Sequence, residues 1–226
     1  MKPVKTLIAA NVVASLFIAA SAHAFGLPAA LGGAPSANST SSSSNDNLAS
    51  QDALVKAFVA SEIEVLTAES LLEQAYGKKD TAKLCDDQVK ALQNTSVDSD
   101  TLEKTVDVSK KAGAEIADQQ SKQAALSDDE KKFYIQSLPH FAKGVIGTHD
   151  VVTKAATFAS GLKGSGSNIG GMLSGGMLKL KSGMFIAKST PEYSKNLFEV
   201  FRKTVMIGQN SGVKIPADAT SALGDL

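Results

Sequence analysis

The hydrophobic pattern is strongest in residues 51–76, the longest stretch of the chain without glycine or proline. Most of these residues are good helix formers. On a helical wheel the stretch has several apolar stripes, one of which repeats every seven residues through Phe58, Val65 and Leu72. A helix that is apolar on most sides is usually surrounded by other helices. The pattern therefore predicts the central helix of a bundle.

Capping signals and 3–4 spacings predict further helices along the chain. Asp80 is the expected cap of the second helix, and Asp100 with Glu103 is the expected capping pair of the third. Ser127 and Glu130 form a capping box, and Thr190 before Pro191 is typical of a helix start. The predicted helices cover residues 81–94, 101–124, 128–138, 139–160 and 191–207, with one short turn over 218–223.

Proline and glycine set the expected ends of these helices. Pro139 lacks an amide hydrogen, so we expect it to break or kink the fourth helix. Gly77 is the expected stop of the central helix, and Gly208 and Gly212 are expected to end the last long one. After the proline, the residues expected to be buried are Phe141, Val145, Val152, Ala156 and Ala159.

Together these elements predict an all-α fold, an irregular bundle of five or six helices around the helix near 51–76. A single helical domain over residues 48–226 suits the length of the chain.

The N-terminal residues have the features of an export signal. Lys2 and Lys5 precede an apolar segment, and Ala22 to Ala24 form an A-x-A cleavage pattern before Phe25. We expect residues 1–24 to be removed after Ala24 and the protein to be periplasmic or secreted. Residues 25–47, rich in Ser, Gly, Pro and Asn, are expected to be a disordered linker.

Composition narrows the class of partner. Basic and acidic residues number 23 each, and Arg202 is the only arginine. This balance excludes neither a protein nor an apolar ligand, but it disfavours nucleic acid. Cys85 is the single cysteine and shares an apolar stripe with Ala82, Val89 and Leu92, so we expect a core side chain and no intramolecular disulfide.

Residues 161–185 hold much of the chain's glycine and most of its methionine. The first part is expected to be a loop. The part over 170–187 has conflicting periods, so helix, strand and loop all stay open. This stretch supplies the expected contact residues for a ligand or partner: Met172, Met177, Met184 and Phe185. It also raises an alternative, insertion of residues 170–187 into a membrane interface.

The chemistry-bearing residues point to no reaction. His140 and His149 are nine apart, about 180° on a helix, so they cannot share a metal. We expect no catalytic residue, no metal and no cofactor. The best-defined polar line is Glu62, Glu69 and Glu73, which we expect to be a solvated edge of the central helix.

The function that follows is an exported, non-enzymatic helical binding or adaptor protein of the bacterial cell envelope. Its expected partner is an envelope protein or an apolar ligand. A membrane-active protein is the alternative, and an enzyme that uses the glutamate line is a remoter one. That enzyme would require a raised pKa at Glu69 or Glu73.

Overall fold

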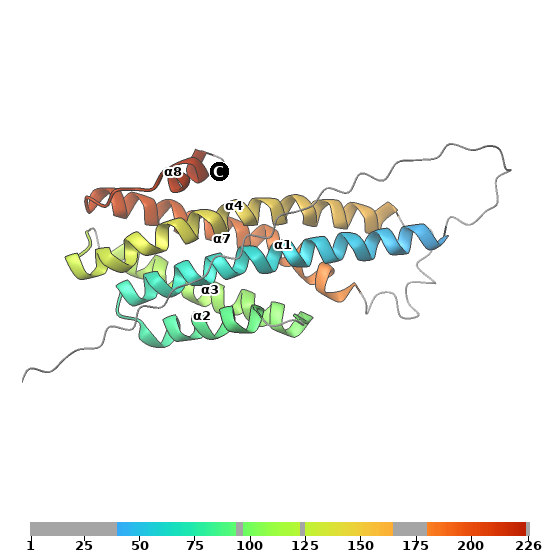
Figure 1. Cartoon of the computed structure of the whole chain (residues 1–226), viewed down its shortest axis with the longest axis horizontal. Helices are drawn as coiled ribbons and strands as arrows, with labels where there is room; N and C mark the ends of the chain where they lie inside the picture. Colours follow the sequence, from blue (N-terminus) through green and yellow to red (C-terminus); the bar gives the residue numbers. More distant parts are fainter. Residues whose placement is uncertain (1–39, 94–96, 123–124, 165–179, 225–226) are drawn as a thin grey trace, which may run out of the picture. The chain divides into compact units, whose positions relative to one another are not determined.

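The computed structural model describes residues 40–93, 97–122, 125–164 and 180–224, which form six helices and no strand (Figure 1). In chain order these are α1 (Thr40–Ala75), α2 (Lys79–Leu92), α3 (Ser99–Lys122), α4 (Asp128–Gly164), α7 (Lys181–Asn210) and α8 (Ala217–Gly224). The all-α prediction is confirmed for this part of the chain.

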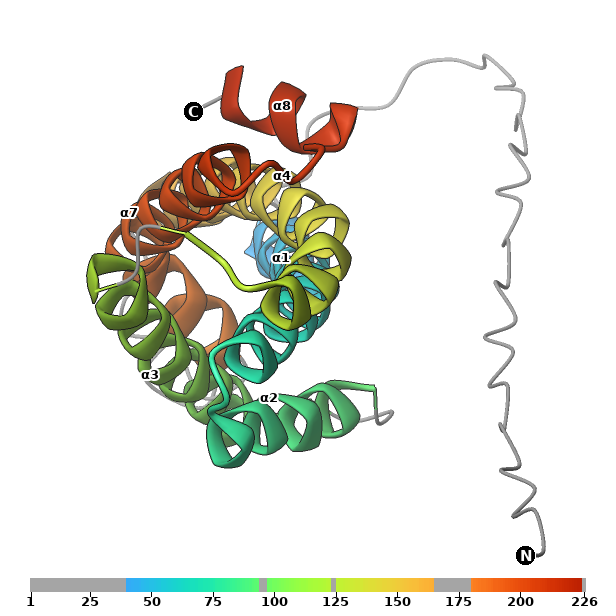
Figure 2. The same cartoon turned by 90° about the vertical axis from the view of Figure 1, so that its left-hand side faces the viewer.

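Four long helices surround the core, and Figure 2 shows them nearly end-on. α1 packs against α4, α3 and α7, while α4 and α3 each also pack against α7. α2 covers α1 and α3 on one side, and α8 covers α4 on the other. Because α1 contacts four other helices, its central position is confirmed. Its side chains Leu54, Phe58, Val65, Leu66 and Leu72 are buried.

α1 is longer than predicted and begins at Thr40, inside the segment expected to be disordered. The expected disorder is therefore wrong for residues 40–47. Asn47 and Gln51 are both buried, and Gln51 Oε1 accepts a hydrogen bond from the Gly183 amide at 3.0 Å. Contacts with α7, remote in the sequence, therefore hold this end of α1. The rest of the segment, with residues 1–24, lies outside the described residues.

Neither proline begins a new helix. α4 runs through Pro139, so the predicted break and restart there are wrong, and α7 begins at Lys181 and contains Thr190 and Pro191, so the predicted start at Pro191 is wrong too. Thr190 Oγ1 donates to the Ile186 carbonyl at 2.6 Å, so the threonine bonds back into the helix instead of capping a new one. Burial of Leu138, Phe141 and Ile186 in the core stabilises both helices across the missing amide.

The buried side of α4 is also shifted by one position after Gly147. Val152 and Ala156 are exposed and Ala159 is half-buried, contrary to expectation; Val151, Ala155 and Phe158 are buried in their place. The two sets share Phe141 and Val145 and diverge afterwards, because the buried positions Phe141, Thr148 and Ala155 recur every seven residues, the period of helices that pack along one another.

The helix ends mostly follow the sequence. Gly77 and Gly212 have φ of +73° and +74°, and each terminates a helix with paired backbone bonds. Asp98, not Asp100, caps α3, accepting from the Thr101 amide at 2.8 Å. α2 begins at Lys79 without a side-chain cap, so Asp80 lies in its first turn instead of before it.

The capping box of α4 is confirmed. The Ser127 amide donates to Glu130 Oε2 at 2.6 Å, and the Glu130 amide donates to Ser127 Oγ at 3.4 Å. Ser127→Ala is expected to lower the free energy of unfolding by about 1 kcal/mol, because the Glu130 amide loses its acceptor, Ser127 Oγ, and the reciprocal bond to Glu130 Oε2 loses its counterpart. Urea denaturation measures the change. Ser121→Ala, at an exposed position of α3, is the control and should change stability by less than about 0.5 kcal/mol.

Candidate functional site

Three glutamates of the central helix are buried, which overturns their prediction as a solvated edge. Glu62, Glu69 and Glu73 are 0%, 1% and 0% exposed. They lie at i, i+7 and i+11 of α1, hence near one face of the helix. That face is covered by α3 and α7, whose positions the local sequence of α1 does not reveal.

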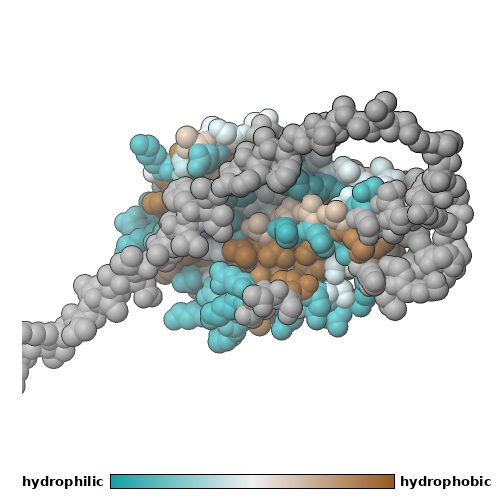
Figure 3. All heavy atoms as spheres, turned by 45° about the vertical axis from the view of Figure 1, so that its right-hand side comes forward, coloured by the Kyte–Doolittle hydropathy of each residue, from teal (hydrophilic) through white to brown (hydrophobic). Residues whose placement is uncertain are grey.

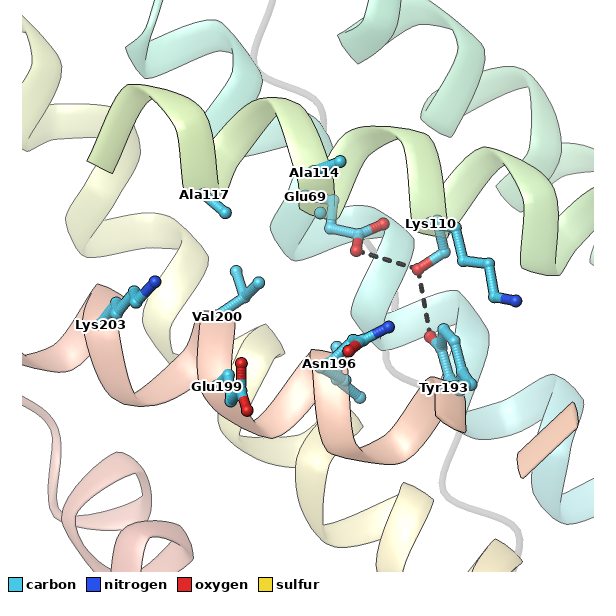
Figure 4. Close-up of a pocket in the computed structure, with 12 residues that line it drawn as sticks. Glu69, Lys110, Ala114, Ala117, Tyr193, Asn196, Glu199, Val200 and Lys203 are labelled. Atoms are coloured by element: carbon cyan, nitrogen blue, oxygen red, sulfur yellow. Dashed lines mark hydrogen bonds between the residues drawn. The ribbon is translucent and has the colours of Figure 1, made fainter. Parts of the chain in front are cut away.

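Two of these carboxyls, those of Glu69 and Glu62, are joined by a chain of hydroxyl groups, and Figure 4 shows the part of it between Glu69 and Tyr193. Ser109 Oγ of α3 donates to Glu69 Oε1 at 2.9 Å, and Tyr193 OH of α7 donates to Glu62 Oε2 at 2.9 Å. The two hydroxyl oxygens are 3.1 Å apart. The chain Glu69–Ser109–Tyr193–Glu62 therefore connects three helices through polar groups inside the bundle. We call these four residues the buried hydroxyl chain.

Some carboxyl oxygens of the cluster have no hydrogen-bond partner among the residues that the structure describes. These are Glu62 Oε1, Glu69 Oε2 and both side-chain oxygens of Glu73. Most buried polar groups in proteins are hydrogen-bonded, so unpartnered carboxyl oxygens are uncommon. Such groups are often associated with functional sites, although buried structural networks produce them as well.

Burial raises the pKa of each carboxyl because the charged form loses its hydration. Desolvation raises the pKa of Glu62 to about 8, against a lowering by the Tyr193 hydrogen bond. Desolvation and then repulsion from Glu62 hold the pKa of Glu69 well above its usual range. Desolvation and then the nearby Glu115 raise the pKa of Glu73 to about 8. Burial thus favours retention of protons by the cluster near neutral pH.

A pocket of about 260 Å³ opens beside the buried hydroxyl chain, between α3 and α7. Figure 4 shows the Glu69 carboxyl reaching the space between these two helices from α1 behind them. Small and apolar side chains form much of the wall, including Ala117, Leu197 and Val200. Charged and amide groups complete the lining: Lys110, Asn196, Glu199 and Lys203. An apolar recess with a few polar groups is the usual form of a small-molecule site.

The charges that line the pocket largely offset one another. Lys110 Nζ lies 3.7 Å from Glu192 Oε1, so part of its charge is balanced outside the pocket. Lys203 and Glu199 both line the pocket and carry opposite charges. Gly113 leaves space at the wall, because an added Cβ would lie 3.7 Å from Glu69 Oε1, an ordinary contact distance.

Of the four expected contact residues in the methionine-rich stretch, the structure describes Met184 and Phe185. Met172 and Met177 lie outside the described residues, so their expected role stays a prediction. Met184 is 39% exposed on α7, and Phe185 is half-buried against the core. Residues 161–164 belong to α4, so the predicted loop is wrong at its start. Residues 181–185 belong to α7, so of the forms left open for 170–187 this part is helix.

The single cysteine and the two histidines named from the sequence lie away from the pocket lining. Cys85 is fully buried with Leu66, Leu92 and Ala112, as expected, and burial raises its thiol pKa. His149 is exposed. His140 Nδ1 lies 2.6 Å from Glu64 Oε2, a pair that joins α4 to α1. Among the described residues, no cluster of His, Cys, Asp and Glu is suited to a metal ion.

A second surface feature is apolar. Figure 3 shows a patch of hydrophobic side chains on one face of the bundle. A groove of about 550 Å³ lies between α1, the end of α2 and the start of α7. Its apolar lining includes Val55, Val59, Ile63, Leu92 and Val97. In the portion of the chain described, no helix combines the length and hydrophobicity needed to cross a bilayer.

Sequence reasoning missed Ser109 and Tyr193 as site residues, although a signal for each exists. Ser109 falls between Val106 and Ala112 on the apolar side of α3, where a buried hydroxyl needs a partner. Tyr193 shares the apolar side of α7 with Leu197 and Val200, and a buried tyrosine hydroxyl also needs a partner. Both residues therefore pointed to polar groups inside the bundle.

These features define an all-α bundle with a buried carboxyl cluster and an adjoining small pocket. No protein-family model matches the chain, and neither a curated protein nor a solved structure matches it.

Proposed function

We propose that this chain is an exported, non-enzymatic binding protein of the bacterial cell envelope that holds a small ligand between α3 and α7. The observation that carries the proposal is Glu69. This carboxyl lines the pocket, is 1% exposed, and keeps Oε2 without a partner among the described residues. Leaving a buried acceptor unsatisfied costs roughly 1–3 kcal/mol, which a ligand that donates a hydrogen bond would recover.

The size of the pocket supports a small ligand. Its 260 Å³ lies just below the range of about 300–1,000 Å³ typical of pockets for drug-sized molecules. The proposed ligand therefore has an apolar body of a few carbon atoms and one polar end. This narrows the expected apolar ligand to one with a polar head group. The proposal of export is supported by the signal-peptide pattern of residues 1–24. Their expected removal leaves Phe25 as the first residue.

The enzyme alternative predicts a raised pKa at Glu69 or Glu73, and both are raised. Burial alone accounts for this, so the result does not separate a catalytic acid from a binding group. A general acid also needs a second group placed to act on the substrate. Among the described residues, Ser109 is the hydrogen-bond partner of Glu69 and Tyr193 is the next group along, and both hydroxyls are engaged in the buried hydroxyl chain. Binding is the function that this arrangement supports best.

The test is native mass spectrometry of the full chain isolated from the envelope of an expressing bacterium. The protein is expected to carry a small molecule of fixed mass and to begin at Phe25. Ala117→Leu, which fills the pocket wall, should lose the bound mass. Ala156→Leu, at an exposed position of α4, is the matched control and should retain it. Equal retention by both variants, or a protein that never carries a ligand, would contradict the proposal.

A further inference from the structure

The buried hydroxyl chain contains more hydrogen-bonding contacts than its hydroxyl groups have hydrogens. Three oxygen–oxygen contacts, at 2.9, 3.1 and 2.9 Å, link Glu69, Ser109, Tyr193 and Glu62. Ser109 and Tyr193 each supply one hydrogen. If both donate to carboxylates, nothing lies between their own two oxygens. The third hydrogen must then come from a carboxyl group.

We infer that Glu62 and Glu69 share one proton through Tyr193 and Ser109, and that this chain gives the pocket a hydrogen-bond acceptor suited to a small ammonium ligand. The ligand class rests on the proposed function. The shared proton does not, because it follows from contacts within the free protein.

Two arrangements satisfy all three contacts. In the first, Glu62 Oε2–H donates to Tyr193, Tyr193 donates to Ser109, and Ser109 donates to the Glu69 carboxylate. In the second, Glu69 Oε1–H donates to Ser109, Ser109 to Tyr193, and Tyr193 to the Glu62 carboxylate. The two interconvert when each of three hydrogens moves to the neighbouring oxygen. One proton is thereby transferred from one glutamate to the other, and total charge is conserved.

One shared proton suits the chain better than none or two. With none, two carboxylates are buried and the Ser109–Tyr193 contact has no hydrogen, which is costly in a desolvated site. With two, four hydrogens meet three contacts, so one O–H has no acceptor within the chain. On Glu62 Oε1 or Glu69 Oε2 that hydrogen would find no acceptor in the described part of the protein. The raised pKa values of both glutamates disfavour the state with no proton.

Other charged and titratable groups lie on each helix that packs against α1. On α1 itself the charge of Glu73 adds to the rise in the pKa of Glu69. From α2 comes Cys85, whose own pKa is raised partly by Glu69 and Glu73. α3 and α7 contribute the remaining groups: Lys110, Lys111, Glu115, Glu192, Glu199 and Lys203. On α4, His140 is paired with Glu64, which lies between Glu62 and Glu69 in the sequence.

The buried hydroxyl chain determines which kind of ligand group can hydrogen-bond to Glu69. In either arrangement the proton is on Oε1 or absent, so Oε2 is an acceptor in both. The complementary group is therefore a donor, such as an alcohol or an amine. A protonated amine gains more, because the shared proton can move to Glu62 and leave the full negative charge on Glu69. No proton then has to leave the protein. A carboxylate ligand only accepts hydrogen bonds and therefore cannot pair with Oε2.

The first part of the test is a ¹³C NMR titration of the full chain with labelled glutamate side chains. Glu62 and Glu69 are expected to show the same two titration steps, each carbon shifting in both, as coupled groups do. Ser109→Ala removes the central link and should separate the steps, one for each glutamate. Ser137→Ala is the control, because Ser137 is a buried serine that bonds only locally, to the Tyr134 carbonyl. If Ser109→Ala does not fold, the wild-type titration decides by itself. Independent single steps in the wild type would overturn the shared proton.

The second part is isothermal titration with hexylammonium, hexanol and hexanoate near pH 7. The expected order of affinity is hexylammonium at least tenfold above hexanol, with no binding of hexanoate. Hexylammonium should bind without net proton release when buffers of different ionisation enthalpy are compared. Tighter binding of hexanoate would overturn the ligand class. Shared titration steps without binding of any probe would refute the proposed function while leaving the shared proton intact. Binding of hexylammonium together with independent titration steps would refute the shared proton while leaving the proposed function intact.

Discussion

Gly144→Ala is expected to destabilise the bundle by about 2–3 kcal/mol, because α1 and α4 meet at this glycine without room for a side chain. An added Cβ would lie 2.6 Å from Val65 Cγ2 and 3.0 Å from the Val65 backbone nitrogen. A side chain can rotate away, but a backbone nitrogen in the middle of α1 cannot. The helices would have to move apart, and the Ser61 Oγ hydrogen bond to the Gly144 carbonyl, now 2.8 Å, would lengthen.

Chemical denaturation measures this loss, with Gly113→Ala as the matched control. Both glycines lie inside helices, and both substitutions improve helix propensity by roughly 1 kcal/mol. The Cβ at position 113 meets its neighbours at 3.7 and 4.0 Å, which are ordinary contacts. Gly113→Ala is therefore expected to be neutral or stabilising by up to about 1 kcal/mol. Equal effects of the two substitutions would show that the approach of α1 to α4 does not depend on Gly144.

The stability of the protein is expected to fall as pH rises from about 5 to 8. Glu62 and Glu73 have pKa values near 8 in the folded chain, against an ordinary value of 4.5. Between these values the folded state binds more protons than the unfolded state, so the free energy of unfolding decreases with pH. Each such carboxyl contributes a slope of up to about 1.4 kcal/mol per pH unit.

Glu64 acts in the opposite direction at lower pH. Its hydrogen bond with His140 lowers its pKa. Its contribution is therefore present above about pH 4.5 and is lost as pH falls through its folded-state pKa. Maximum stability is expected near pH 5, between the two effects.

Urea denaturation across this pH range measures the slope. Glu73→Gln should flatten it by the share of one carboxyl, since glutamine keeps the shape but does not titrate and Glu73 lies outside the buried hydroxyl chain. Glu103→Gln, at an exposed position of α3, is the matched substitution that should leave it unchanged. A stability that rises from pH 5 to 8 would contradict the buried, protonated cluster.

Helix positions could be predicted where local chemistry decides them. The capping box at Ser127, the glycine stops at Gly77 and Gly212 and the apolar stripe through Cys85 all act within a few residues of the chain. Predictions failed at Pro139 and Thr190, where packing of remote side chains stabilises a helix that local preference would end. The same applies to the first turns of α1, held by contacts with α7.

The candidate site divides in the same way. By itself, the sequence determined the all-α class, the central helix and the line of three glutamates along it. Only the tertiary structure decided that this line is buried, because the helices that cover it come from residues 40 and 131 positions away. Helical periodicity shows which residues share a face, but it carries no information on what packs against that face. The pKa of each carboxyl and the link through Ser109 and Tyr193 depend on that packing.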